Sequence, residues 1–140
     1  MKMGSRLIRG GCFLLALSWA HAQERLSTSK GMFSEAQAKR GAAAYNSNCA
    51  SCHGDDLRST DREVSNLDEE TFKRRFVGKT IGDLFETAKE TMPPELKGSL
   101  DDQTYLDIVT YILKFNKTPS GSQELKPDLP LLKRIFIDPL

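Results

Sequence analysis

Residues 48–54 read Asn-Cys-Ala-Ser-Cys-His-Gly, with two cysteines three positions apart and a histidine directly after the second. This Cys-x-x-Cys-His arrangement fits three kinds of chemistry: a redox-active dithiol, one half of a zinc site, or the covalent attachment of a haem. Each kind needs different partners elsewhere in the chain. The rest of the sequence therefore decides what Cys49, Cys52 and His53 do.

The first 22 residues have the pattern of a secretory signal peptide. Three basic residues precede a short apolar run over 12–19, and Ala20-His21-Ala22 matches a cleavage site. The apolar run is shorter than the roughly 20 residues that a membrane-spanning helix needs. We therefore expect an exported protein, periplasmic in a bacterium, whose mature chain has no membrane span.

Removal of this segment changes the chemical inventory of the chain. Cleavage after Ala22 takes away three of the 20 basic residues and none of the 19 acidic ones, which leaves a net charge of −2. A near-neutral chain lacks the basic surface typical of nucleic-acid-binding proteins, so we expect no nucleic-acid partner. Cys12 and His21 are also lost. The cysteines and the histidine of the mature chain are then Cys49, Cys52 and His53.

Cap residues and helical spacing predict four or five short helices and almost no strand. Ser34 with Gln37, and Thr80 with Asp83, have the spacing of capping boxes. We expect a flexible leader over 23–32, a domain over 33–117 and an extended tail over 118–140 that packs on the domain. Within the domain we expect helices over about 35–46, 68–76 and 81–90, and a last helix, capped by Ser99 or Asp101, that reaches Phe115. So few helices make a thin core, which a large buried apolar cofactor would complete.

The remaining residues favour haem attachment over the other two chemistries. A redox dithiol usually follows a strand, whereas a predicted helix precedes Cys49. Zinc takes four protein ligands, or three and a water, and the mature chain has no further cysteine or histidine to complete the set. Haem attachment needs only the two thiols, which add to the porphyrin vinyl groups, and the adjacent His53, which coordinates the iron.

Met92 is the candidate for a second axial ligand. A low-spin electron carrier needs a second strong ligand, usually Met or His, and the mature chain has no second histidine. Met92 follows the predicted third helix and precedes Pro93 and Pro94, which stiffen its loop. Met32 lies in the polar leader and is a poorer candidate.

The helix before Cys-Ala-Ser-Cys-His, the stretch Thr-Met-Pro-Pro and the final amphipathic helix together resemble a class I (monohaem) cytochrome c over about residues 33–116. The run GDLFETAKETMPPELKGSLDDQTYLDIVTYILKFNKTPSGSQEL, residues 82–125, is similar to cytochrome domains that accompany PQQ-dependent quinoprotein dehydrogenases. The resemblance implies an all-α, cytochrome c-like bundle wrapped around one covalently bound haem c and its iron. It also implies that Gly41 and Tyr45 cross the last helix near Tyr111.

The function that this resemblance implies is the transfer of single electrons, not enzymatic catalysis. The donor would be a dehydrogenase, in particular a PQQ-dependent one, and the acceptor a further redox protein such as a terminal oxidase. The alternative is a haem-based enzyme or gas sensor with an open sixth coordination position, if Met92 does not bind the iron. Candidates for contact with the haem propionates are Arg62, Arg74, Arg75 and Lys79.

One feature of the sequence departs from the family pattern. Many members have a proline soon after the haem motif, and a backbone carbonyl there orients the ligating imidazole. This chain has no proline between His53 and Pro93. Some other acceptor must therefore bind the second ring nitrogen of His53.

Overall fold

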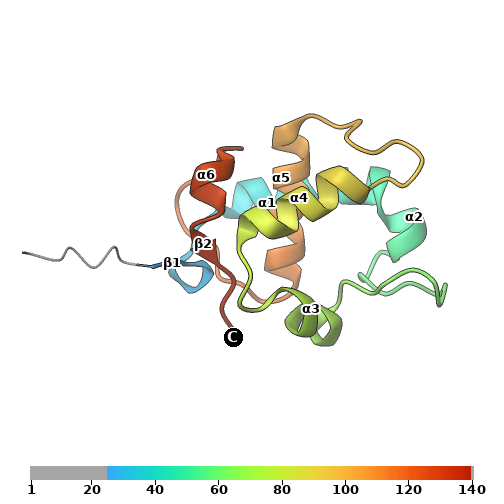
Figure 1. Ribbon diagram of the computed structural model, residues 1–140, viewed down its shortest axis with the longest axis horizontal. Coiled ribbons are helices and arrows are strands. Elements are labelled where there is room, and N and C mark those ends of the chain that lie inside the picture. Colours follow the sequence, from blue (N-terminus) through green and yellow to red (C-terminus); the bar gives the residue numbers. More distant parts are fainter. Residues whose placement is uncertain (1–24, 140) are drawn as a thin grey trace, which may run out of the picture.

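The computed structural model describes residues 25–139 and consists mainly of helices (Figure 1). This confirms the predicted all-α class, since the sheet within the described residues has two strands of two residues each. In chain order the elements are β1 (Leu26–Ser27), the 3-10 helix η1 (Thr28–Lys30), α1 (Glu35–Asn48), α2 (Ala50–His53), α3 (Glu69–Phe76), α4 (Ile81–Thr91), α5 (Asp102–Phe115), α6 (Leu129–Leu132) and β2 (Ile135–Phe136).

The longer helices begin at capping side chains, and the sequence predicts this role for Ser34, for Thr80 and, as one of two candidates, for Asp101. Ser34, Asp68 and Asp101 each accept a hydrogen bond from a backbone N–H in the first turn of α1, α3 and α5. Thr80 and Asp83 form a complete capping box at α4, with the side chain of each accepting from the backbone N–H of the other, at 3.1 and 2.8 Å. A capping side chain contributes about 1 kcal/mol, so local chemistry sets these boundaries.

At Ser34 only one half of the predicted capping box is present. Gln37 is fully buried, and its Nε2 donates to Asp107 Oδ1 and to the carbonyl of Leu125, both at 3.0 Å. Its Oε1 accepts from the N–H of Leu125 at 2.9 Å. Because a buried amide left unpaired is costly, Gln37 links α1, α5 and the tail instead of returning to the end of its own helix.

The contact between α1 and α5 is the most extensive between two helices and forms the frame of the domain. A Cβ atom at Gly41 would lie 1.8 Å from the carbonyl oxygen of Asp107, so the two backbones approach this closely only because residue 41 is glycine. One turn later, the rings of Tyr45 and Tyr111 pack with their centroids 5.1 Å apart. The helix crossing expected at these residues is therefore present.

The segments on either side of the helical domain pair with one another. β1 and β2 run parallel, with Leu26 opposite Ile135 and Ser27 opposite Phe136. Figure 1 shows this pair beside α6, at the end of the molecule away from α2. Residues 26–30 of the expected leader over 23–32 thus form a short strand and a 3-10 helix. The tail contributes buried side chains to the core: Leu125, Leu132, Ile135 and Ile137.

Within residues 25–139, no helix is long and apolar enough to cross a membrane. The predicted signal peptide, residues 1–22, lies outside the described residues.

Candidate functional site

A cavity of about 470 Å³ lies between the helices, and its wall is mainly apolar. This volume is within the range of about 300–1,000 Å³ that is typical of cofactor and small-molecule pockets. The wall is built by the end of α1, by α2, by the loop over 63–67, by the facing sides of α3, α4 and α5, and by the loop after α4. All four predicted haem-binding residues line it: Cys49, Cys52, His53 and Met92.

The two cysteines lie on one short helical turn. Cys49 joins α1 to α2, and Cys52 follows three residues later, a spacing that puts both thiols on the same side of a helix. Both are free thiols, with Cys49 half-buried and Cys52 exposed. Burial, together with the neighbouring Cys52, raises the pKa of Cys49 to about 11. Redox-active dithiols have a cysteine of lowered pKa, so this environment does not favour the dithiol alternative.

His53 is buried and held by two hydrogen bonds. Its backbone N–H donates to the carbonyl of Cys49 at 2.9 Å, and its ring Nδ1 lies 3.1 Å from the carbonyl oxygen of Ser65. Because a carbonyl can only accept, Nδ1 carries the proton and Nε2 keeps its lone pair for a metal. Burial lowers the pKa of His53. The hydrogen bond to Ser65 raises this pKa, and the positive charge of Arg75 lowers it. The imidazole is therefore neutral at pH 7, which is the form that binds iron.

The loop after the motif is shaped to bring Ser65 to His53. Gly54 has a φ of +76°, and a Cβ there would lie 2.1 Å from the carbonyl oxygen of Arg58, so the chain turns tightly at this glycine. Leu57, fully buried with a φ of 62°, accepts from the N–H of Leu67 at 2.8 Å. The loop over 58–66 is closed by that bond, and Ser65 lies near its end.

Met92 caps the end of α4 and faces the same cavity as His53. Its backbone N–H donates to the carbonyl of Ala88 at 3.0 Å. Its carbonyl accepts from the hydroxyl of Tyr105, on α5, at 2.7 Å. Both backbone groups of Met92 are thus bound to helices, which holds its thioether side chain at the cavity wall. Met32 does not line the cavity but packs against the core.

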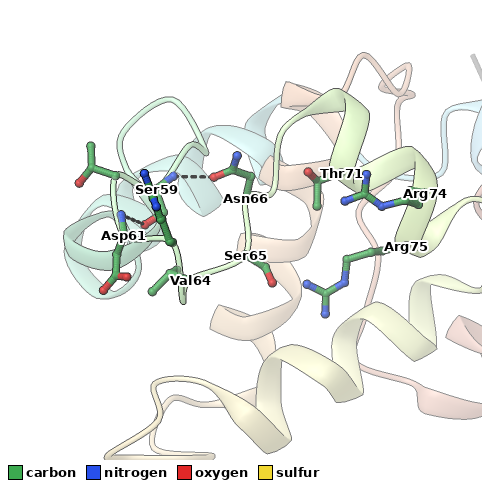
Figure 2. Close-up of a pocket in the computed structure, with 10 residues that line it drawn as sticks. Ser59, Asp61, Val64, Ser65, Asn66, Thr71, Arg74 and Arg75 are labelled. Atoms are coloured by element: carbon green, nitrogen blue, oxygen red, sulfur yellow. Dashed lines mark hydrogen bonds between the residues drawn. The ribbon is translucent and has the colours of Figure 1, made fainter.

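The four basic residues considered for the haem propionates lie in different surroundings. Arg75 lines the cavity and also a second, polar pocket beside it, whereas Arg62 and Arg74 line only the second pocket (Figure 2). Lys79 lies over the ring of Phe76, 5.6 Å from its centroid, and lines neither. Of the four, the structure brings only Arg75 to the cavity.

The donor set of the cavity suits a covalently attached haem. It offers two thiols and one imidazole on one segment, a thioether from the loop after α4, and otherwise mostly apolar side chains. In the described part of the chain, no group of three or more Cys, His, Asp or Glu side chains could hold a metal ion. The zinc alternative therefore lacks the ligands it needs, while the two thiols, the axial donors and the apolar wall are the groups that a haem requires.

Two residues of this site were not predicted from the sequence. Ser65 contributes its backbone carbonyl, which any residue could provide, so its identity is no signal. Tyr105 is buried on α5, and its hydroxyl reaches a loop 13 residues earlier in the chain. A buried tyrosine usually has a partner for its hydroxyl, which is the signal that could have drawn attention to it.

Comparison with known proteins gives one family. No curated protein matches the chain, and no solved structure matches it. Residues 36–112 match the family model described as cytochrome C oxidase, cbb3-type, subunit III, and this stretch begins on α1 and ends on α5, enclosing the cavity and all four predicted ligands. Because the match covers more than half of the 140 residues, the chain belongs to this family of class I cytochromes c, and its prosthetic group is a covalently attached haem c with its iron.

Proposed function

We propose that this protein is an exported monohaem cytochrome in which Cys49 and Cys52 attach the haem, and His53 and Met92 are the axial ligands. One observation carries the proposal: these four residues, separated by up to 43 positions in the chain, line a single apolar cavity. The hydrogen bond from His53 Nδ1 to Ser65 supports the ligand role, because it directs the other ring nitrogen to the metal.

The protein side chains have three tasks in this function. The thiols hold the cofactor so that it stays with the carrier between encounters, and the His/Met pair favours the reduced iron and raises the reduction potential. The apolar wall keeps water from the metal, which also raises the potential. The cofactor itself supplies the one-electron chemistry when bound. No substrate is transformed, so the function is that of a carrier.

We place the protein in the periplasm, between a dehydrogenase and a downstream acceptor such as a terminal oxidase. The signal-peptide pattern of residues 1–22 supports export, and the similarity of residues 82–125 to cytochromes that accompany PQQ-dependent dehydrogenases supports the donor. In this arrangement residues 33–117 form the electron-transfer domain and residues 118–140 a structural tail. Reduction of the purified carrier by a PQQ-dependent dehydrogenase, followed by stopped-flow absorbance, tests the donor.

Replacement of Met92 tests the axial ligand and separates the carrier from a gas sensor or haem enzyme. The ferric parent protein should be low-spin with a weak band near ~695 nm, which reports the Met–iron bond. Met92→Ala should lose this band and show a clearly lower reduction potential, whereas Met32→Ala, the matched control, should change neither. A parent protein that is high-spin and binds CO readily would contradict the carrier function.

A further inference from the structure

Asn116 holds the far end of the loop that orients His53. This loop, residues 54–67, follows the haem motif, and we call it the histidine loop. Asn116 is the residue at which α5 ends, and only 5% of its surface is exposed. Its Nδ2 donates to the carbonyl of Leu67 at 2.9 Å and to the carbonyl of Ile112 at 2.8 Å. The side-chain amide thus joins the histidine loop to α5.

The bond from Asn116 acts on the part of the loop that contacts the imidazole. The N–H of Leu67 donates to the carbonyl of Leu57 at 2.8 Å, so both backbone groups of Leu67 are held. The bond to Leu57 stays within the loop, whereas the bond from Asn116 ties the loop to a helix. Ser65 lies two residues before Leu67, and its carbonyl accepts from His53 Nδ1 at 3.1 Å. A displacement of Leu67 therefore passes through two linked residues to this hydrogen bond.

The same face of α5 also holds the segment that carries Met92. The hydroxyl of Tyr105 donates to the carbonyl of Met92 at 2.7 Å, and Asn116 follows Tyr105 by 11 residues. Eleven residues make about three helical turns, so the two residues lie on one face. Ile108 and Ile112, between them on this face, line the haem cavity. The two segments that carry the proposed axial ligands are thus bound at opposite ends of one helix.

Only the donor half of the Asn116 amide is used. Both N–H groups face carbonyls, which can only accept, so the orientation of the amide is fixed. Oδ1 is buried and has no hydrogen-bond partner within residues 25–139. A buried acceptor without a partner is uncommon and lowers stability. A leucine of similar shape would avoid this cost but could not bind the two carbonyls, so the two donors explain the amide at this position.

We propose that Asn116 is a positioning residue for His53, which acts through Leu67 and the carbonyl of Ser65. Asn116 itself does not line the haem cavity. A ligating imidazole whose second nitrogen donates a hydrogen bond is fixed in orientation and is a stronger donor to the metal. By holding the acceptor of this bond, Asn116 helps to set the reduction potential. The inference rests on the proposed function, in which His53 is an axial ligand.

Asn116→Leu tests the proposal, because leucine has nearly the shape of asparagine but no N–H donor. In the reduced low-spin holoprotein, NMR spectroscopy follows the exchange of the His53 Nδ1 proton with solvent. This exchange should be about 2–13 times faster in the variant, the factor by which one net hydrogen bond changes the equilibrium between closed and open loop. The reduction potential should rise, because a looser hydrogen bond makes the imidazole a weaker donor to ferric iron.

Gln37→Met is the matched control for the stability of the fold. Gln37 is also a buried amide that donates two hydrogen bonds, and they go to Asp107 and Leu125, outside the histidine loop. Gln37→Met should therefore lower the free energy of unfolding and leave the exchange rate and the reduction potential at the values of the parent protein. Equal changes in both variants would overturn the proposal. An exchange rate or a potential in Asn116→Leu equal to that of the parent would overturn it as well.

A measurement on the parent holoprotein keeps the test independent of the folding of the variant. If Asn116 holds the loop, its Nδ2 protons and the Nδ1 proton of His53 exchange through the same opening. Their opening free energies should then be equal and should fall together as urea is added below the unfolding transition. A His53 proton that exchanges while the Asn116 amide stays protected refutes the proposal. Failure of the proposed function is distinguishable, because the parent spectrum would lack covalent haem or the band near ~695 nm.

Discussion

The hydrogen bond between Tyr105 and Met92 makes a quantitative prediction about Met92 as the proposed axial ligand. The buried hydroxyl of Tyr105 donates to the carbonyl of Met92 at 2.7 Å and so ties the ligand loop to α5. Tyr105→Phe removes this bond and keeps the ring that packs in the core. Displacement of Met92 by an added ligand requires the loop after α4 to move. In the parent protein this movement breaks the hydrogen bond from Tyr105, whereas in Tyr105→Phe there is no such bond to break.

The size of the effect follows from the environment of the bond. A neutral hydrogen bond contributes a net ~0.5–1.5 kcal/mol to the state that contains it. Met92 is only half-buried, so water can reach its carbonyl once the hydroxyl is gone, and the larger penalty for a dry unpaired carbonyl does not apply. A free energy in this range changes an equilibrium constant by a factor of about 2–13. Tyr105→Phe should therefore bind the competing ligand about 2–13 times more tightly.

Titration of the ferric holoprotein with imidazole measures this directly, through loss of the band near ~695 nm that reports Met–iron ligation. Tyr111→Phe is the matched control, because it removes a hydroxyl from the same helix. Among the described residues this hydroxyl makes no hydrogen bond, and the ring that carries it packs against Tyr45. Its affinity for imidazole should equal that of the parent. An unchanged affinity in Tyr105→Phe would refute the view that this hydrogen bond holds the ligand loop.

Two further substitutions test the frame around the site, each by urea unfolding of the holoprotein. Gly41→Ala should lower the free energy of unfolding by about 2 kcal/mol or more, because the new methyl group meets the carbonyl of Asp107. Helix propensity alone would raise the free energy of unfolding by about 1 kcal/mol. An increase would therefore show that α1 and α5 are not in close contact. Asp83→Asn should cost about 1 kcal/mol at neutral pH, because the carboxylate caps α4. Lys133 and the cap lower the pKa of Asp83 from 3.8 to about 2, so the difference from the parent should vanish as the pH falls through this interval. A difference that stays constant there would contradict the carboxylate's role.

The sequence predicts best those features that local chemistry determines. The helix starts at Ser34, Asp68, Thr80 and Asp101 follow from side chains that bind the N–H groups of the next turn, so a few consecutive residues suffice. The five-residue haem motif is equally local, because the thiols and the imidazole must come from one segment. Met92 is the proposed second ligand because few residues after the predicted signal peptide can bind iron.

Two features that depend on contacts across the chain were not predicted. The pairing of β1 with β2 joins residues more than 100 positions apart and involves two residues on each side, which is too short for any periodicity to appear. Gln37 has the spacing of a capping residue, yet its contacts with Asp107 and Leu125, 70 and 88 positions away, determine its conformation. In each case tertiary contacts outweigh a local preference, which is weak by comparison.

The missing proline shows why one side chain can be absent while its role is kept. Orientation of His53 requires a carbonyl oxygen close to Nδ1, and every residue has a carbonyl. The path of the backbone, not the type of side chain, therefore decides whether a carbonyl reaches this position. Here Gly54 makes the first turn, the bond from Leu67 to Leu57 closes the loop, and the N–H of Ser59 donates to Asn66 Oδ1 at 2.9 Å beside Ser65. A proline would restrict the same path through its fixed φ, whereas this chain restricts it through hydrogen bonds within the loop. The polar residues of this loop thus provide the contacts that hold the carbonyl acceptor of His53, the proposed haem ligand.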